Sequence, residues 1–191
     1  ISVGLVGWFL FILYCIETTP KPYSPATEDS WTITSDFYSK IQTPPDGTTD
    51  KDGNFVVKGT SDVLTATFYK SGVAGHGKTT TSNKVSYGGY GSWSKTEITG
   101  GKIKNDCLKI ADVKGAVTLT IKWALNGAAT DSRTLQVTVG DEGKSVDTKC
   151  NGTKGAQTDY VVNFDAGAGT NVYIGASNEI CIVSVTIEAQ K

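Results

Sequence analysis

The sequence predicts an all-β head, folded as a two-sheet β-sandwich or jelly roll, with an apolar α-helix at its N-terminus. The chain carries no charged residue before Glu17, which is typical of a helix surrounded by lipid or protein. The rest of the chain contains many short stretches in which apolar and polar residues alternate, the pattern of half-buried strands. Glycine is abundant, with 22 residues among 191, and turn residues separate these stretches. Together these observations favour short strands joined by tight turns.

Residues 1–17 form the predicted apolar helix. Its first sixteen residues would span about 24 Å at roughly 1.5 Å per residue, slightly less than the ~30 Å hydrocarbon core of a bilayer. Large apolar side chains cover every face of this helix, so lipid or protein must surround it. The side chains expected to make the assembly contacts are Val3, Leu5, Val6, Trp8, Phe9, Leu10, Phe11, Ile12, Leu13 and Ile16.

The start of the chain suggests how this segment arose. The chain contains no Met and begins with Ile1, so we expect that an upstream piece has been removed while the apolar segment is retained. The segment is then a mature N-terminus left by a peptidase, a trimmed single-pass anchor or an uncleaved signal core. We favour a segment packed inside an assembly. Residues 18–30 follow as a semi-rigid stalk, because three prolines end the helix and keep the chain extended.

The head is predicted to occupy residues 31–191 and to consist of strands, with no convincing helix after Glu17. Within 116–124, for example, the apolar residues fall at every second position and would line one face of a strand. Trp31 and Trp123 are expected in the core. The expected strands are 31–37, 55–58, 63–69, 84–87, 93–98, 108–111, 116–124, 133–139, 145–149, 160–164, 171–174 and 180–188.

Charge and cysteine content limit the possible partners and sites. The 18 basic and 19 acidic residues give a net charge of −1, which provides no field to attract nucleic acid. Of the four cysteines, Cys15 lies in the apolar segment. Cys107, Cys150 and Cys181 are candidates for one disulfide, whose pairing the sequence does not decide. No C-x-x-C spacing occurs, which argues against a zinc or redox site.

Two motifs that could carry catalysis lack the context that catalysis needs. Residues 72–79 fit the phosphate-binding formula G-x-x-x-x-G-K-[ST], but the β-branched and turn residues that follow are poor material for the required helix. We interpret them as a flexible loop between strands. His76, the single histidine, lies in that loop, where nothing nearby would hold one tautomer. No arrangement of catalytic residues is found, so we do not expect an enzyme.

Three further groups of residues are weighed as binding or modification sites. Asp46, Asp50 and Asp52 form the densest acidic group, a weak candidate for structural calcium that also fits two ordinary polar turns; no other cofactor is expected. Tyr87, Tyr90 and Trp93 could stack on a sugar ring, could contact a neighbouring head, or could pack over glycines in a hairpin. Asn151 begins an N-glycosylation sequon on an apparent turn.

Two parts of the chain resemble known families. The runs LKIADVKGAVTLTIKWALNGAATDSRTLQVTVG and YVVNFDAGAGTNVYIGASNEICIVSVTIE resemble jelly-roll modules of secreted bacterial polysaccharide-active proteins, over roughly residues 103–188. That resemblance implies a jelly-roll fold and, more weakly, sugar binding. The N-terminus is similar in layout to type IV pilin-like subunits, in which an apolar helix precedes a β-rich head, although Leu5 stands where the bacterial pattern has an acidic residue.

Two functions remain open after these considerations. The first hypothesis is a structural subunit of an extracellular, cell-surface filament, in which the apolar helices of identical copies pack together and the head forms the outer surface. Burying about ten large apolar side chains at roughly 1.5 to 3 kcal/mol each would supply ample association energy. The alternative is a membrane-anchored carbohydrate-binding module whose head holds a surface glycan. A saccharide-dependent rise in melting temperature would favour the second.

Overall fold

The structure is a computed structural model, and it describes residues 29–59, 64–69, 97–99, 102–104, 107–125, 133–143, 146–149, 153–177 and 180–190. The predicted apolar helix and most of the predicted stalk lie outside these residues, as do the 72–79 motif and His76. The predictions for those segments therefore stay predictions. Within the described part of the chain, no helix has the length and apolarity needed to cross a membrane.

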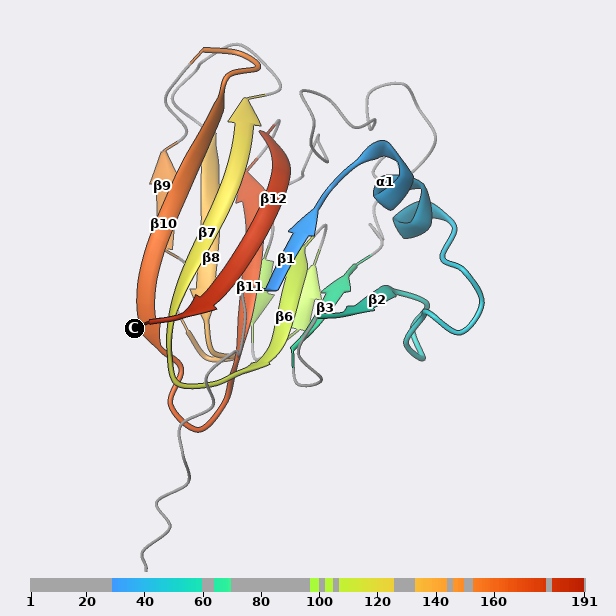
Figure 1. Ribbon diagram of the computed structural model, residues 1–191, viewed down its shortest axis with the longest axis horizontal. Coiled ribbons are helices and arrows are strands. Elements are labelled where there is room, and N and C mark those ends of the chain that lie inside the picture. Colours follow the sequence, from blue (N-terminus) through green and yellow to red (C-terminus); the bar gives the residue numbers. More distant parts are fainter. Residues whose placement is uncertain are drawn as a thin grey trace, which may run out of the picture.

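The strands form two antiparallel sheets and a small hairpin (Figure 1). The four-stranded sheet has the order β1 (Asp29–Thr32), β12 (Ile180–Ala189), β7 (Ala116–Leu125) and β10 (Gln157–Asp165). The six-stranded sheet has the order β2 (Phe55–Lys58), β3 (Thr65–Phe68), β6 (Leu108–Val113), β11 (Thr170–Ser177), β8 (Thr134–Val139) and β9 (Val146–Lys149). The hairpin consists of β4 (Glu97–Thr99) and β5 (Lys102–Lys104). The predicted two-sheet β-sandwich is thereby confirmed.

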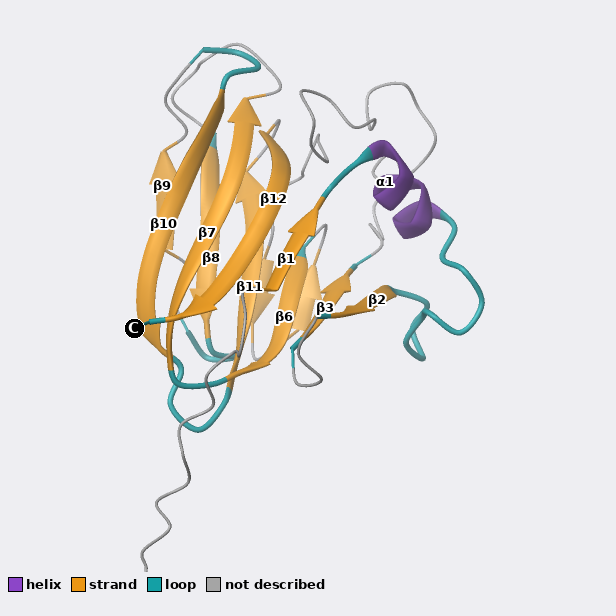
Figure 2. Cartoon of the chain, viewed as in Figure 1, coloured by secondary structure: helices purple, strands orange, loops and turns teal. Residues whose placement is uncertain are grey.

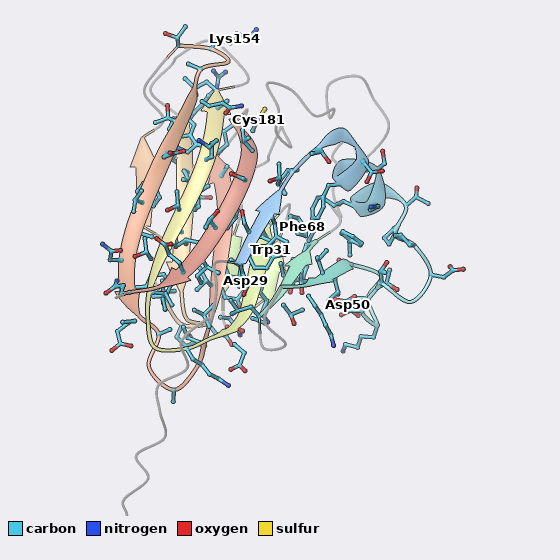
Figure 3. All side chains as sticks on the ribbon, in the orientation of Figure 1. Asp29, Trp31, Asp50, Phe68, Lys154 and Cys181 are labelled. Carbon is cyan, nitrogen blue, oxygen red and sulfur yellow. The ribbon has the colours of Figure 1, made fainter. Side chains whose placement is uncertain are left out.

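The core lies between the two sheets, where alternate residues of each strand meet. In β7, Leu119 and Ile121 are fully buried, while the threonines beside them face outward and are partly exposed. Trp31 and Trp123 are both 4% exposed, which confirms their predicted place in the core. Figure 3 shows Trp31 and Phe68 among the side chains that fill this layer. The alternation over the first part of β7 explains why this strand was visible in the sequence.

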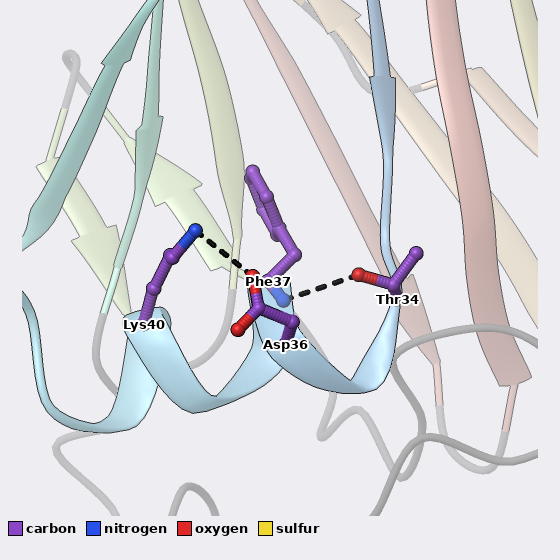
Figure 4. A network of polar contacts seen from close by, with 4 residues as sticks. All are labelled: Thr34, Asp36, Phe37 and Lys40. Atoms are coloured by element: carbon purple, nitrogen blue, oxygen red, sulfur yellow. Dashed lines mark hydrogen bonds and ion pairs between the residues drawn. The ribbon is translucent and has the colours of Figure 1, made fainter.

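One helix corrects the sequence-based prediction. We expected a strand over 31–37 and no helix beyond Glu17, but β1 ends at Thr32 and α1 spans Ser35–Gln42 (Figure 2). The reason is local, because the Thr34 hydroxyl accepts a hydrogen bond of 3.2 Å from the Phe37 amide and caps the first turn (Figure 4). An ion pair of 2.9 Å between Asp36 and Lys40 adds i,i+4 support.

The helix is held on the sandwich by Phe37, which contacts two phenylalanines of the six-stranded sheet. Its ring centroid lies 5.6 Å from that of Phe55 and 4.9 Å from that of Phe68, both edge-on. The apolar side chains of Phe37 and Ile41 therefore belong to a helix face, although they also fit a strand pattern in so short a segment.

The cap gives a first testable prediction. The variant Thr34→Ala is expected to lower the free energy of unfolding by about 1 kcal/mol, because the Phe37 amide loses its acceptor at the helix start. Urea denaturation followed by tryptophan fluorescence measures the change. Thr34→Ser keeps the acceptor and is the matched control, so an equal loss in both variants would contradict the capping role.

Most other differences concern strand ends. β10 begins at Gln157 rather than at residue 160, and β11 runs to Ser177 rather than to residue 174. The hairpin strand β5 was not predicted. β1 begins at Asp29, two residues before the predicted start of the head. Strand ends depend on hydrogen bonds to neighbouring strands, and the sequence pattern does not contain those pairings.

Candidate functional site

Three turns meet at one end of the six-stranded sheet, and together they form the candidate site. β11 lies between β6 and β8 and runs antiparallel to both, so its start lies beside their ends. The turns after β6 and before β11 are the lower loops of the sandwich in Figure 2. The Gly115 amide donates to the Gly167 carbonyl at 2.9 Å, and the Gly140 amide donates to the Asn171 carbonyl at 2.8 Å. These bonds join the three turns into one rim.

The rim encloses an open hollow of about 580 Å³. This volume lies within the range of roughly 300–1,000 Å³ found for small-molecule sites. The hollow presents carboxylates, an amide, a hydroxyl and backbone groups. Its lining residues are Ala111, Asp112, Gly140, Asp141, Glu142, Gly143, Gly169, Thr170 and Asn171.

Asp141 is the best-fixed carboxylate of the hollow. Its Oδ1 atom accepts a hydrogen bond of 2.9 Å from Asn171 Nδ2 and another from the Tyr173 hydroxyl. Both donors stand on β11 two residues apart, so they project from the same outer face of the sheet. Within the described part of the chain, no hydrogen bond or ion pair occupies Asp141 Oδ2. One carboxylate oxygen is therefore held by the fold and the other can accept a bond from a ligand.

The charge state of this pair follows from its contacts. The hydrogen bonds from Tyr173 and then Asn171 lower the pKa of Asp141, so it is a carboxylate at neutral pH. Burial and the bond to Asp141 raise the pKa of Tyr173, which therefore stays a neutral hydrogen-bond donor. On the neighbouring strand, Lys109 Nζ lies 5.7 Å from the centroid of the Tyr173 ring and contributes to the lowered pKa of Asp141.

Asp112 forms the opposite wall of the hollow. It adopts a left-handed backbone conformation with φ of 57°, which is uncommon for a residue other than glycine. Its amide donates to Asn171 Oδ1 at 3.4 Å, and its carboxylate forms an ion pair of 2.9 Å with Lys114. Gly169 must be glycine here, because φ is 147° and a Cβ atom would lie 2.7 Å from Asp112 Oδ1. Asn171 thus bridges the two walls.

The structure describes only some of the sequence-predicted site residues. Tyr87, Tyr90 and Trp93 lie outside the described residues, as do Asn151, Cys15, Cys150 and the apolar residues of 1–16. The roles proposed for them therefore stay predictions. None of the predicted site residues that the structure does describe lines the hollow.

The acidic group that was weighed for calcium lies in the loop between α1 and β2. Asp50 Oδ1 accepts bonds of 2.9 Å from the amides of Asp52 and Asn54, and Oδ2 accepts one of 3.0 Å from Asn54 Nδ2. Burial opposes ionisation of Asp50, but these bonds outweigh it and lower its pKa. The loop thus uses this carboxylate to order its own backbone. No group of three or more potential metal-binding side chains comes together in the described ranges.

The two described disulfide candidates belong to different parts of the sandwich. Cys107 immediately precedes β6, and its thiol donates a hydrogen bond of 3.4 Å to the Leu108 carbonyl. Cys181 belongs to β12 and is buried with Ala124 and Val183 in a small cluster on the outer face of the four-stranded sheet. The disulfide prediction stays open, because Cys150 lies outside the described residues.

Sequence reasoning missed the residues of the hollow. Asp112, Asp141 and Asn171 sit in or beside Gly-containing turns that read as ordinary strand connections. The sequence did contain one indication of a site, since each of the three segments combines a glycine with a carboxylate or an amide. The strand order that brings them together is not visible in the sequence, and without it the turns look unrelated.

Comparisons with known proteins complete the description. No protein-family model matches the chain, and no curated protein matches it. Among solved structures, the chain is similar to a CBM35 from Cellvibrio japonicus Abf62, with a TM-score of 0.36 and 17% identity over 53% of this chain and 88% of that one. It is also similar to a family 35 carbohydrate-binding module from an environmental isolate, with a TM-score of 0.39 and 20% identity over 64% and 87%.

A third similar structure is a family 35 carbohydrate-binding module from Clostridium thermocellum. Its TM-score is 0.36, with 15% identity over 55% of this chain and 91% of that one. At these levels of identity and TM-score, the similarities carry no argument about what this chain binds. The proposed function therefore rests on the geometry and charge of the hollow.

Proposed function

We propose that the head is a non-catalytic binding module for a saccharide, and that the hollow between the three turns is its binding site. The observation that carries this proposal is the fixed Asp141 carboxylate, which presents one oxygen to an open hollow of about 580 Å³. Sugar hydroxyls are hydrogen-bond donors, and a carboxylate is the strongest acceptor that a neutral sugar can use. Thr170 and Asn171 line the same hollow and add a hydroxyl and an amide.

The charges of the rim favour a neutral saccharide over an anionic one. Asp112 is neutralised by Lys114 at 2.9 Å, but Asp141 and Glu142 lack a basic partner among the residues that line the hollow. Even with Lys109 near Asp141, the three carboxylates that line the hollow outnumber the two lysines beside them, so the described side chains leave an excess of negative charge. An acidic sugar or a phosphate would meet like charges there, whereas a neutral sugar donates hydroxyl hydrogens to them.

The proposal is tested by thermal unfolding in the presence of a panel of neutral and acidic oligosaccharides. A saccharide that binds the folded state stabilises it and raises the melting temperature, by more as the ratio of its concentration to its Kd increases. At least one neutral oligosaccharide is expected to raise the melting temperature of the wild-type chain. The variant Asp141→Ala is expected to lose this shift, because it removes a charged acceptor worth about 1.5–3 kcal/mol, or roughly a tenfold to 150-fold change in affinity.

The control is Glu188→Ala, which removes an exposed carboxylate on the outer face of the four-stranded sheet. This variant is expected to keep the full saccharide-dependent shift. If no oligosaccharide shifts the wild-type melting temperature, or if both variants lose the shift equally, the hollow is not the binding site.

The filament hypothesis remains a second candidate because residues 1–16 are apolar and uncharged. Those residues lie outside the described part of the chain, so the structure does not test contacts between copies of this segment. Self-assembly through them, the cell-surface location and the anchoring of the head in a membrane therefore stay predictions. The saccharide proposal concerns the head alone and does not depend on which of these predictions is correct.

A further inference from the structure

The outer edge of β10 is unusually open for a strand of its length. β10 is the last strand of the four-stranded sheet, and no described residue pairs with its outer side (Figure 1). It pairs with β7 over Gln157–Asp165 without a register shift. Natural edge strands are commonly protected by short length, a bulge, a proline or a lysine. The sequence QTDYVVNFD contains no proline or lysine and pairs without a bulge, although Asp159 and Asp165 place charge on this edge.

One apolar side chain is exposed among the polar residues on the outer face of this strand. Val161 is 55% exposed and is the exposed large hydrophobic residue of the described part of the chain. On the inner face, Tyr160, Val162 and Phe164 pack against the core but remain partly exposed. A strand pairing with this edge would cover both groups and would satisfy the outward backbone amides and carbonyls.

The order of residues along β10 makes the strand complementary to a second copy of itself. If two copies pair antiparallel about a two-fold axis at Val161, each Asp159 lies opposite Asn163 of the other copy. Val161 then faces its own equivalent. Outer-face residues of one copy then lie opposite outer-face residues of the other, so the two four-stranded sheets join into one continuous sheet.

The alternative registers that keep the faces matched are less favourable. Centring the axis on Asp159 would place that carboxylate against its own equivalent, and centring it on Val162 would place Asp159 against Asp165. Like charges directly opposite each other destabilise a strand pair. Centring on Tyr160 would place Asp159 against the apolar Val161 side chain. Of these four registers, the one about Val161 is the one in which no carboxylate lies opposite a like charge or an apolar side chain.

The existing hydrogen bonds leave the required groups available. Asn163 Oδ1 already accepts a bond of 2.7 Å from the Thr118 hydroxyl, so its Nδ2 atom is the group left to act as a donor. Asp159 Oδ1 forms an ion pair of 3.0 Å with Lys122, which leaves Oδ2 as an acceptor. By symmetry, one Asn163-to-Asp159 bond would form on each side of the axis.

We propose that two copies of this chain pair through the outer edges of β10, antiparallel and centred on Val161, to give a continuous sheet with four strands from each copy. This inference goes beyond saccharide binding and does not rest on it. In such a pair the two hollows lie at opposite ends of the joined sheet, because each lies beside the turn that follows β10 of its own copy.

The register is tested by cross-linking the full chain under oxidising conditions and reading dimer formation on non-reducing gels. Opposite residues of an antiparallel pair have Cα atoms about 4.5–5.5 Å apart, within disulfide range. Val161→Cys is expected to give covalent dimer at least tenfold above wild type, which controls for the natural cysteines. Asp159→Cys alone is expected to give no such increase in covalent dimer. Position 159 lies opposite Asn163 of the other copy, four residues along the strand from that copy's own position 159. A mixture of Asp159→Cys and Asn163→Cys chains is expected to cross-link.

The hydrogen bonds are tested by sedimentation of charge variants. Asn163→Asp replaces both interchain bonds with opposed carboxylates, and we expect the dimer dissociation constant to rise about 100-fold or more. The double variant Asp159→Asn with Asn163→Asp exchanges donor and acceptor and is expected to restore pairing to within about tenfold. If the Val161→Cys chain cross-links no more than the Asp159→Cys chain, or if the double variant fails to recover, the proposed pairing is wrong. Association through any other surface would show neither the cross-linking preference of Val161→Cys nor the recovery in the double variant.

Discussion

The variant Phe68→Ala is expected to lower the free energy of unfolding by about 3–5 kcal/mol, the usual cost of removing a buried aromatic ring. Phe68 is 3% exposed in β3, and its ring centroid lies 4.9 Å from that of Phe37 in α1 and 6.4 Å from that of Phe55 in β2. Removing the ring leaves a cavity where the helix meets the sheet. Because Phe37 of α1 packs directly on this ring, the helix is expected to loosen as well.

Urea denaturation measures this loss, and amide hydrogen exchange in α1 reports the loosening. Glu188→Ala removes an exposed side chain from β12 and is the control, expected to change stability by less than about 0.5 kcal/mol. A loss below about 1.5 kcal/mol for Phe68→Ala, with α1 still protected from exchange, would contradict the described packing of the three rings.

The variant Gly143→Ala is expected to disrupt the turn that carries Asp141, costing about 1–3 kcal/mol of stability together with most of the saccharide affinity. A Cβ atom at position 143 would lie 2.0 Å from the carbonyl oxygen of Val139 and 3.1 Å from that of Gly140. Both atoms belong to the backbone, so the turn must rebuild to accept the methyl group. Asp141 lies inside this turn and would move away from Tyr173.

Gly47→Ala provides the control for this prediction. Gly47 has φ of 76°, but a Cβ atom there would meet nothing within 4 Å. It should therefore show only the cost of a left-handed backbone, about 1–2 kcal/mol, with saccharide binding unchanged. Comparing the two variants by denaturation and by titration separates steric disruption of the hollow from a general effect of replacing a glycine. Unchanged saccharide binding in Gly143→Ala would exclude this turn from the site.

The architecture of the head was predictable from the sequence because several strands alternate over much of their length. In β7 every second residue is buried from Val117 to Trp123, and turn residues between the strands mark where the chain reverses. The helix α1 was not predicted, because residues 31–37 contain apolar residues at spacings that suit either a strand or a short helix. The decisive feature was the capping bond of Thr34, a single contact in a short segment.

The candidate site was less predictable than the fold. Asp112, Asp141 and Asn171 are separated by many residues in the chain and meet because β11 inserts between β6 and β8. That strand order depends on long-range pairing, which leaves little trace in local sequence. The aromatic and cysteine candidates were chosen for their chemistry alone. The acidic loop at Asp50 was noticed for its composition, but its hydrogen bonds show a carboxylate that organises its own turn.

Calorimetric titration of a neutral oligosaccharide into the wild-type chain and into Asp141→Ala tests the central claim most directly. We expect saturable binding to the wild type with one site per chain, and affinity at least tenfold weaker in Asp141→Ala. Glu188→Ala should bind like the wild type. Equal affinity of the wild type and Asp141→Ala would contradict a saccharide site built on the hollow between the three turns.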